Sequence, residues 1–268
     1  MNKTRFASIA LCCLFVALGV LQTRSAQAAI KTQTVEYKQG DTTLEGFLAY
    51  DDSIQSKRPG IIVVPGWNGV DDSGKMRAQM LAQLGYVAFV ADVYGKGIRP
   101  STSKEAAQEA GKYSRNRPLY RARMQAALDV LRKSPLADSG KLAAIGYCFG
   151  GAGALELARS GADVAGVVTF HGDLSTPTPQ DARNIKGRVL VLHGADDPAV
   201  PLKAVEALEK EMSDAKVDWQ VVLYSGTVHS FTSPSAGNDN SRGSAYNERA
   251  DKRSWIAMQD FFREIFTN

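Results

Sequence analysis

The six residues Gly146-Tyr147-Cys148-Phe149-Gly150-Gly151 decide the fold of this chain. They follow an apolar run that ends at Ile145, and the residues after them, 152–155, are a good helix start. At so sharp a strand-to-helix turn the central residue takes strained backbone angles, and larger side chains two positions before and after it would collide with their surroundings. The motif therefore predicts a nucleophile elbow with Cys148 as the nucleophile. The alternative is a glycine-rich turn around an inert core cysteine.

Short β-branched runs alternate with amphipathic stretches on both sides of this motif. The expected strands are Thr32–Tyr37, Thr43–Tyr50, Gly60–Val64, Tyr86–Val93, Lys141–Gly146, Val164–Phe170, Arg188–His193 and Asp218–Tyr224. The expected helices are Ser73–Leu84, Lys104–Lys112, Pro118–Lys133, Gly150–Ser160, Pro201–Ser213 and Ala245–Phe266. This alternation predicts an α/β fold with a mostly parallel sheet of about eight strands and helices on both faces. Sites in such sheets lie at the carboxyl ends of the strands.

A thiol nucleophile needs a base, and the base needs an orienting acid. In folds built around this elbow, the acid and then the histidine follow the nucleophile along the chain. His229 alone follows the acidic candidates, so it is predicted to be the base. His171 and His193 come too early, and their positions at strand ends are explained by packing or backbone hydrogen bonding.

Two adjacent aspartates, Asp196 and Asp197, compete for the role of the acid after the strand that ends at His193. The turn pattern G-x-x-D-x-x-V-P, which is common in proteins built around this elbow, runs from Gly194 to Pro201 and selects Asp197. Asp196 is then a turn residue or a cap.

Two backbone N–H groups are expected to hold the negative oxygen that forms during acyl transfer. One belongs to Phe149, directly after the nucleophile, and the other is predicted to be that of Trp67 in the loop after the strand Gly60–Val64. A loop of glycine and tryptophan is also compatible with simple packing. The loop Gly95–Lys104 is expected to form one wall of a pocket, and Ser230–Tyr246 is expected to be a surface loop.

Residues 1–28 are expected to be a signal peptide rather than part of this domain, which then spans residues 29–268. Lys3 and Arg5 form a basic start, Ile9–Leu21 is apolar, and Ala26-Gln27-Ala28 offers small residues for cleavage after Ala28. The apolar run of about 13 residues is too short for a membrane anchor, which needs about 20. The protein is therefore predicted to be exported, to a periplasm or to the medium.

Removal of this segment changes the cysteine count and the charge. Cys12 and Cys13 leave with it, and Leu11 stands where a lipoprotein signal needs a small residue, so Cys148 remains alone and has no internal disulfide partner. The segment carries three basic residues and no acidic one, which leaves 32 − 3 = 29 basic and 28 acidic residues, or a net charge of +1. A nearly neutral chain gives no reason to expect nucleic acid or an anionic membrane as a partner.

These motifs resemble the dienelactone hydrolases (carboxymethylenebutenolidases), a branch of the α/β-hydrolase fold. The resemblance covers nearly all of residues 29–268 and rests on VVPGWNGV, ADVYGKG, GYCFGG, ADDPAVP and HSF. By position it implies a catalytic triad of Cys148, Asp197 and His229. It implies oxyanion donors at Trp67 and Phe149, and no metal or organic cofactor.

The chain departs from the family pattern at positions that the resemblance assigns to substrate binding. Members that hydrolyse dienelactone usually carry a glutamate where this chain has Gly66, and arginines that hold the substrate carboxylate correspond to Lys96 and Ser233. Tyr94, in the ADVYGKG segment, is a further expected substrate-binding position. The resemblance therefore implies an intact catalytic apparatus with an altered specificity.

The sequence thus predicts an exported hydrolase of carboxylic esters or lactones that works through a thioester on Cys148. One alternative keeps the fold and makes the protein a peptidase or an acyltransferase, which peptide cleavage without esterase activity would indicate. The other is a non-catalytic binding protein, and the alkylation kinetics of Cys148 across pH separate it from an enzyme.

Overall fold

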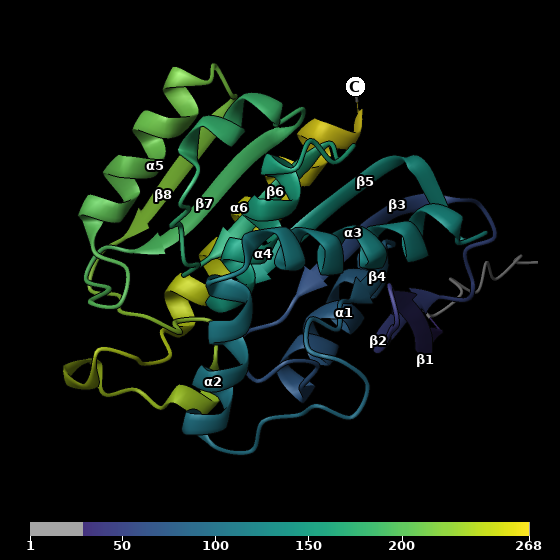
Figure 1. Ribbon diagram of the computed structural model, residues 1–268, viewed down its shortest axis with the longest axis horizontal. Coiled ribbons are helices and arrows are strands. Elements are labelled where there is room, and N and C mark those ends of the chain that lie inside the picture. The colour runs from purple at the N-terminus through teal and green to yellow at the C-terminus, as the bar shows by residue number, and fades with distance from the viewer. Residues whose placement is uncertain (1–28, 268) are drawn as a thin grey trace, which may run out of the picture.

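A computed structural model describes residues 29–267 and places a single eight-stranded sheet at the centre of the molecule (Figure 1). The strands are β1 (Ile30–Gln39), β2 (Thr42–Asp51), β3 (Arg58–Val64), β4 (Val87–Val90), β5 (Ala137–Tyr147), β6 (Gly166–Phe170), β7 (Arg188–Gly194) and β8 (Trp219–Tyr224). Their order across the sheet is β1-β2-β4-β3-β5-β6-β7-β8. The predicted α/β architecture with about eight strands is confirmed.

Only β2 runs against the rest of the sheet. It pairs in antiparallel fashion with β1 and with β4, whereas the pairs from β4 through β8 are parallel. In a parallel sheet the carboxyl ends of neighbouring strands meet at one edge, so the loops after β3, β5, β6 and β7 lie together there. The sheet is thus the scaffold for any site those loops build.

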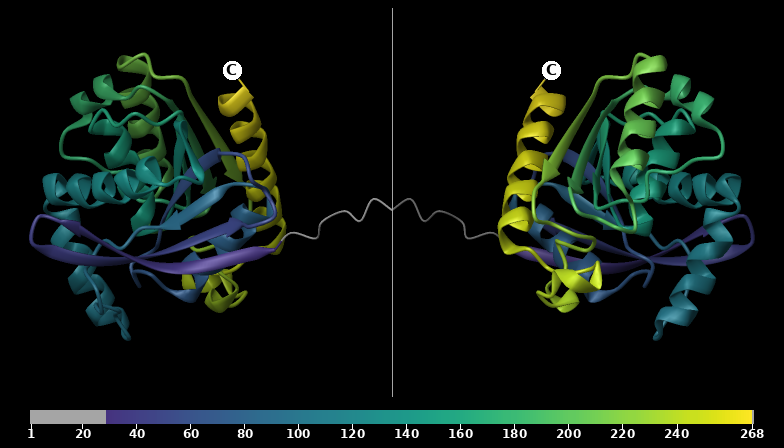
Figure 2. Two further views of the ribbon diagram at one scale, coloured as in Figure 1. Left: turned by 90° about the vertical axis from the view of Figure 1, so that its right-hand side faces the viewer. Right: turned by 90° about the vertical axis from the view of Figure 1, so that its left-hand side faces the viewer.

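Helices cover both faces of the sheet. They are α1 (Asp72–Gln83), α2 (Ser103–Ser114), α3 (Arg117–Lys133), α4 (Phe149–Arg159), α5 (Leu202–Asp214) and α6 (Glu248–Thr267), with short 3-10 turns η1 (Pro179–Asn184), η2 (Pro234–Ala236) and η3 (Asn240–Arg242). Figure 2 shows α6, in yellow, on the opposite side of the sheet from the teal helices. The predicted two-sided covering is confirmed.

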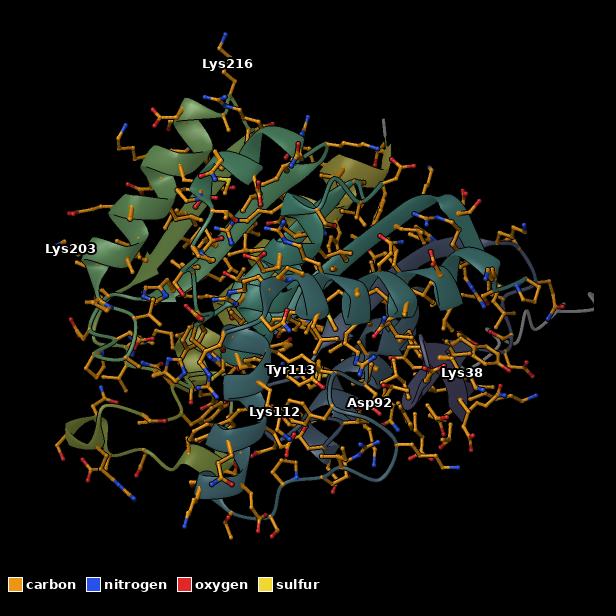
Figure 3. The ribbon with its side chains drawn as sticks, viewed as in Figure 1. Lys38, Asp92, Lys112, Tyr113, Lys203 and Lys216 are labelled. Atoms are coloured by element: carbon orange, nitrogen blue, oxygen red, sulfur yellow. The ribbon has the colours of Figure 1, made fainter. Side chains whose placement is uncertain are left out.

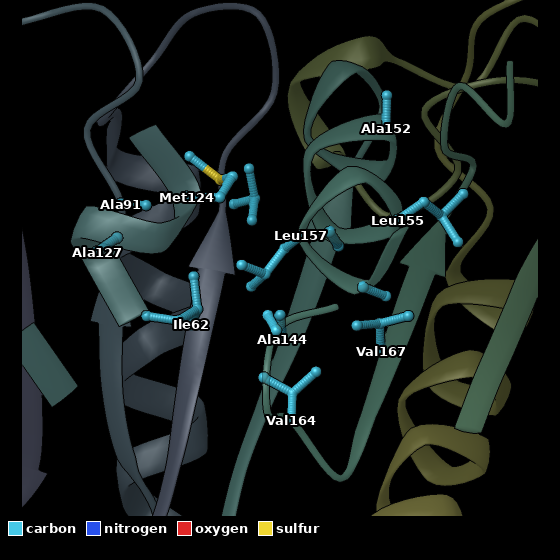
Figure 4. Close-up of a cluster of buried hydrophobic side chains, with 14 of the residues drawn as sticks. Ile62, Ala91, Met124, Ala127, Ala144, Ala152, Leu155, Leu157, Val164 and Val167 are labelled. Carbon is cyan, nitrogen blue, oxygen red and sulfur yellow. The ribbon is translucent and has the colours of Figure 1, made fainter. Parts of the chain in front are cut away.

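Alternation along the central strands builds one hydrophobic core on each face. Ile62 and Val64 of β3 join the cluster under α3, α4 and α5, whereas Ile61 and Val63 point to the cluster under α1 and α6. Figure 4 shows part of the first cluster, in which Met124 of α3 and Leu157 of α4 lie close to Ile62. All four β3 side chains are fully buried, which explains why this strand is a continuous apolar run.

Three predicted element boundaries differ from the structure by more than two residues, and the largest difference is the start of β5, at Ala137 instead of Lys141. The strand expected at Tyr86–Val93 spans only β4, because Asp92 turns the chain by accepting backbone N–H groups from Tyr94 and Gly95. Figure 3 marks Asp92 at this turn. The last helix begins at Glu248 instead of Ala245, and the expected loop Ser230–Tyr246 contains η2 and η3.

The expected signal peptide, residues 1–28, lies outside the described residues, as does its cleavage after Ala28. From residue 29 to residue 267, no helix has the length and the apolar character that a membrane crossing requires.

Candidate active site

Cys148 occupies the sharp turn between β5 and α4, with φ 53° and ψ −120°. The two flanking glycines are required by close backbone approaches. A Cβ on Gly146 would lie 2.0 Å from the carbonyl oxygen of Gly150, and a Cβ on Gly150 would lie 2.2 Å from that of Val64. The left-handed conformation of a non-glycine residue costs about 1–3 kcal/mol, which the surrounding structure has to supply. The strand-turn-helix elbow predicted from the sequence is confirmed.

The elbow brings Cys148 into contact with His229, which follows β8 at the same edge of the sheet. The Sγ atom of Cys148 lies 3.2 Å from Nε2 of His229, and Nδ1 of the same ring lies 2.8 Å from Oδ2 of Asp197. The backbone of His229 is held in turn by the loop that follows it, because its N–H donates to Gly243 and its carbonyl accepts from Ala245. Three side chains from three separate loops thus form one hydrogen-bonded chain.

The structure distinguishes between the two candidate acids. The other carboxylate oxygen of Asp197, Oδ1, accepts the backbone N–H groups of Ala199 at 2.8 Å and Val200 at 3.0 Å, so the carboxylate is buried and fixed in orientation. Asp196 is exposed. Asp197 therefore contacts the imidazole of His229, as the turn pattern predicts.

The protonation of His229 is set by opposing effects. Burial of the ring disfavours its charged form, but the hydrogen bonds to Asp197 and Cys148 and the charges of both partners outweigh burial and raise the pKa of His229 to about 10. The raised pKa therefore favours the charged form of the ring at neutral pH.

The other two histidines make structural contacts. Nε2 of His193 lies 2.8 Å from the carbonyl oxygen of Val200, and burial lowers the pKa of His193. Nε2 of His171 lies 2.8 Å from Oγ1 of Thr232, and burial lowers its pKa well below the ordinary value, with the charge of His229 acting in the same direction. The ring of His171 packs edge-to-face on that of His229 at 5.1 Å, so it holds the base in place.

The two predicted oxyanion donors lie on the loops that flank the sulfur. Among the described residues, neither the N–H of Trp67 nor that of Phe149 has a hydrogen-bond partner. The loop after β3 comes close to the elbow, since a Cβ on Gly66 would lie 3.9 Å from that of Cys148. Both N–H groups are therefore available to a negatively charged oxygen beside Cys148.

Two cavities meet at Cys148. The larger, about 550 Å³, lies between the elbow and α2 and is lined by Trp67, Ala107, Ala110, Phe149, Val200 and His229. The smaller, about 130 Å³, lies between the loop after β3 and the loop after His229 and is lined by Gly66, Asp71, Arg77, Tyr147, His171 and Thr232. The prediction that the loop Gly95–Lys104 forms a pocket wall is wrong, because α2 forms that wall of the larger cavity.

The expected substrate-binding positions separate into two groups. Gly66 and Ser233 line the smaller cavity. Lys96 lines neither cavity, because its ammonium group forms a surface ion pair with Glu36. Tyr94 lies behind the loop after β3, where its hydroxyl donates to the carbonyl of Trp67 at 2.8 Å. The structure therefore does not support direct substrate contact for Lys96 or Tyr94.

Sequence reasoning missed His171, Tyr147 and Arg77 as cavity residues. The sequence did contain a signal that His171 lines the site. It directly follows β6, at the edge of the sheet where the other loops meet. Its left-handed backbone, φ 40°, and that of Ser230, φ 59°, place two further strained residues beside Cys148. Between residues 29 and 267, no cluster of three or more His, Cys, Asp or Glu side chains could hold a metal ion.

Comparisons with known proteins identify the family of the chain. The sequence profile of the dienelactone hydrolase family matches residues 44–266. A solved structure named m3DLH is 42% identical, with a TM-score of 0.85 over 89% of this chain and 99% of that one. The dienelactone hydrolase-like promiscuous phosphotriesterase P91 from metagenomic libraries is 41% identical, with a TM-score of 0.83 over the same shares. A putative carboxymethylenebutenolidase of Methylorubrum extorquens is 26% identical over 77% of this chain and 72% of that protein.

Proposed function

The chain belongs to the dienelactone hydrolase family and is a hydrolase of ester or lactone bonds, and from this premise we propose that Cys148 is its nucleophile, His229 its base and Asp197 its orienting acid. The hydrogen-bonded chain from sulfur through imidazole to carboxylate, at the elbow, is the observation that carries the proposal. Nucleophile activation requires a base in contact with the nucleophile and a group that orients the base, and these two contacts supply both.

In the first half of the reaction the sulfur of Cys148 attacks the carbonyl carbon of the substrate. The thiol proton already lies on Nε2 of His229 when the attack begins, because the raised pKa of that ring favours its charged form. The negative oxygen is held by the N–H groups of Trp67 and Phe149. The bond from carbon to the leaving oxygen then breaks, His229 gives its proton to the departing alkoxide, and the acyl group remains on sulfur as a thioester. Asp197 keeps the ring oriented and stabilises its charged form throughout.

In the second half, water takes the place of the alcohol. His229 removes a proton from the water while its oxygen attacks the thioester carbonyl, and the same two N–H groups hold the new oxyanion. The carbon–sulfur bond breaks, which restores the thiolate beside the charged ring of His229, and the carboxylic acid leaves. Each N–H of such an oxyanion site typically contributes about 10²–10³-fold to turnover.

Replacement of the nucleophile tests this mechanism. We expect Cys148→Ala to lose the hydrolysis of aryl esters and small lactones, and His193→Asn, which changes a histidine that makes a structural contact, to keep most of it. Turnover by Cys148→Ala at the wild-type rate would contradict the proposed mechanism.

A second activity on phosphotriesters is favoured by the 41% identity to the P91 phosphotriesterase over 89% of this chain. The sulfur of Cys148 would attack phosphorus and expel an aryl oxide, which takes its proton from His229, and water would then cleave the phosphorus–sulfur bond. The measurement is aryl oxide release from a diethyl aryl phosphate. Release that survives Cys148→Ala would contradict the assignment to this site.

Export is proposed from the first 28 residues of the sequence alone. The basic start, the apolar run and the small residues before Ala29 support it.

Dienelactone itself is proposed to be a poor substrate, because glycine, lysine and serine replace the glutamate and arginines of family members that act on it.

A further inference from the structure

The imidazole of His229 is fixed at its two nitrogens, by Cys148 and by Asp197, and these hydrogen bonds alone do not resist a tilt of the ring. Packing supplies that restraint. The ring of His171 meets the ring of His229 edge-to-face, with the centroids 5.1 Å apart and the planes at 69°, which is a geometry that aromatic pairs prefer. The position of the base therefore depends on what holds His171.

The ring of His171 is held by the loop that follows the base. Phe231 packs against it edge-to-face at 5.2 Å, and Oγ1 of Thr232 lies 2.8 Å from its Nε2. Both of these side chains are buried. Thr232 thus contacts the ring that packs on His229, although it lies only three residues after His229 in the chain.

The segment between the base and Thr232 is a closed turn. Ser230 has a left-handed backbone, with φ 59°, and its carbonyl accepts the N–H of Ser233 at 2.9 Å. The carbonyl of Phe231 accepts the N–H of Asn247 at 3.1 Å. Because the turn is closed in this way, a displacement of Thr232 is transmitted to His229.

Arg77 of α1 connects this turn to the rest of the molecule. Its Nη2 atom lies 2.8 Å from the carbonyl oxygen of Thr232 and 2.7 Å from Oδ1 of Asp251 in α6. Its guanidinium also lies over the ring of Tyr147, 5.7 Å from the centroid, within the range of a cation–π contact. One buried side chain therefore contacts both the residue before the nucleophile and the turn after the base.

We propose that Thr232, supported by Arg77, is a positioning residue for the reaction. Its hydroxyl holds the ring of His171, which limits the tilt of the imidazole of His229, and its carbonyl, held by Arg77, fixes the turn that follows the base. The inference rests on the ester hydrolysis proposed above and deepens it, because Thr232 and Arg77 act through His229.

Exchange of the side chain of Thr232 tests the contact with His171. Thr232→Val keeps the shape and removes the hydroxyl, whereas Thr232→Ser keeps the hydroxyl and removes a methyl group. Below the melting temperatures of the variants, we expect kcat on para-nitrophenyl acetate to fall about tenfold or more in Thr232→Val with little change in KM, because a small displacement of a catalytic group is costly. Thr232→Ser should restore most of kcat.

Thr169→Val is the matched control for this exchange. It removes a buried threonine hydroxyl from β6, the strand that precedes His171, and this hydroxyl has no partner within residues 29–267. We expect Thr169→Val to keep the wild-type kcat, so that a loss in Thr232→Val is assigned to the contact that its hydroxyl makes.

Alkylation of Cys148 reports the contact between sulfur and imidazole without any substrate. A charged imidazole beside the sulfur keeps the thiol ionised below its free pKa of about 8.5. At about pH 6 we expect iodoacetamide to react several-fold more slowly with Thr232→Val than with the wild type, and Thr232→Ser to react at close to the wild-type rate. A merely structural role for Thr232 would lower melting temperatures and leave this rate unchanged.

The contribution of Arg77 is tested against a background that lacks its ion pair. Arg77→Met alone would leave the carboxylate of Asp251 without its cation, so the comparison is between Asp251→Asn and the double variant Arg77→Met, Asp251→Asn. We expect a kcat that is several-fold lower in the double variant, because only this variant loses the bond to the carbonyl of Thr232. Equal kcat in the two would overturn the role assigned to Arg77.

The outcomes separate this inference from the mechanism on which it rests. Hydrolysis that depends on Cys148 and proceeds at the wild-type kcat in Thr232→Val, or that falls equally in Thr232→Val and Thr232→Ser, overturns the positioning role and leaves the mechanism standing. Hydrolysis that survives Cys148→Ala overturns the mechanism, and the alkylation rates then still show whether Thr232 controls the contact of Cys148 with His229.

Discussion

The neighbouring residues Asp196 and Asp197 differ in burial and in their contact with His229. Asp197 is buried, accepts two backbone N–H groups and contacts His229, whereas Asp196 is exposed. We expect Asp197→Asn to lower kcat/KM by about 10²-fold or more, because the imidazole loses both its orientation and the charge that stabilises its protonated form. Asp196→Asn is the matched control and should retain wild-type activity. Equal losses in both variants, measured by steady-state ester hydrolysis, would contradict the assignment.

The raised pKa of His229 predicts a dependence of stability on pH. A histidine whose pKa rises from 6.5 to about 10 on folding binds its proton more tightly in the native state. The stabilisation is therefore complete below about pH 6.5 and is lost as the pH rises through about 10. We expect the difference in unfolding free energy between the wild type and His229→Gln to shrink over that range in urea titrations. A difference that grows with pH would show that the ring is neutral in the folded protein.

At the scale of elements, the elbow depends on backbone contacts that no side chain can enter. A methyl group on Gly146 would meet the carbonyl of Gly150, so β5 and α4 would have to separate. We expect Gly146→Ala to cost about 3 kcal/mol, which lowers the melting temperature by about 6–12 °C for a chain of this size. Gly140→Ala, in an exposed part of β5 where the nearest atom lies 3.5 Å from the new Cβ, is the control. Similar melting temperatures for both variants would refute the packing argument.

Tyr94 connects the loop after β4 to the two proposed oxyanion donors. Its hydroxyl donates to the carbonyl of Trp67, and its ring packs at 6.0 Å from that of Phe149. We expect Tyr94→Phe to lower kcat by about tenfold with little change in KM, because the loop loses a hydrogen bond that positions a donor used in the transition state. Tyr224→Phe removes a buried hydroxyl that has no partner within residues 29–267 and should change neither constant. A rise in KM at constant kcat would assign Tyr94 to substrate binding instead.

Elements with strong local signals could be predicted, and those set by tertiary contacts could not. The Gly-x-Cys-x-Gly spacing predicts the elbow because close backbone approach tolerates only glycine there. The wall formed by α2 escaped prediction, since the direction of a helix after a loop depends on what it packs against. In this case Tyr113 of α2, labelled in Figure 3, has its ring 5.6 Å from that of Tyr94. The turn pattern favoured Asp197 over Asp196, but only the fold shows which of the two carboxylates is buried.

At the scale of the whole molecule, the parallel sheet gathers side chains that are far apart in the chain. Cys148, Asp197 and His229 follow β5, β7 and β8, and Trp67 follows β3, so four strand ends supply one site. This gathering follows from the alternation of strands and helices and was predictable. The division into two cavities was not, because it depends on how the loops after β3 and β8 pack against each other.

Export is a property of the whole chain and can be tested by mass spectrometry of the recovered protein. We expect the protein expressed with its first 28 residues, in a Gram-negative host, to be recovered outside the cytoplasm with Ala29 as its first residue. Ala28→Asp places a charge where the signal peptidase requires a small side chain and should block the cleavage. Recovery of uncleaved wild-type protein from the cytoplasm would contradict the prediction.

The most direct test of the mechanism is to trap its covalent intermediate. Residues 29–268 contain a single cysteine, so an acyl group on sulfur can lie only on Cys148. After rapid mixing with para-nitrophenyl acetate and acid quenching, we predict one acetyl group on the peptide that contains Cys148, formed as the first equivalent of nitrophenol appears. Full turnover with no acetyl group on that peptide, or with acetylation of another residue that forms and decays at the rate of turnover, would contradict the account.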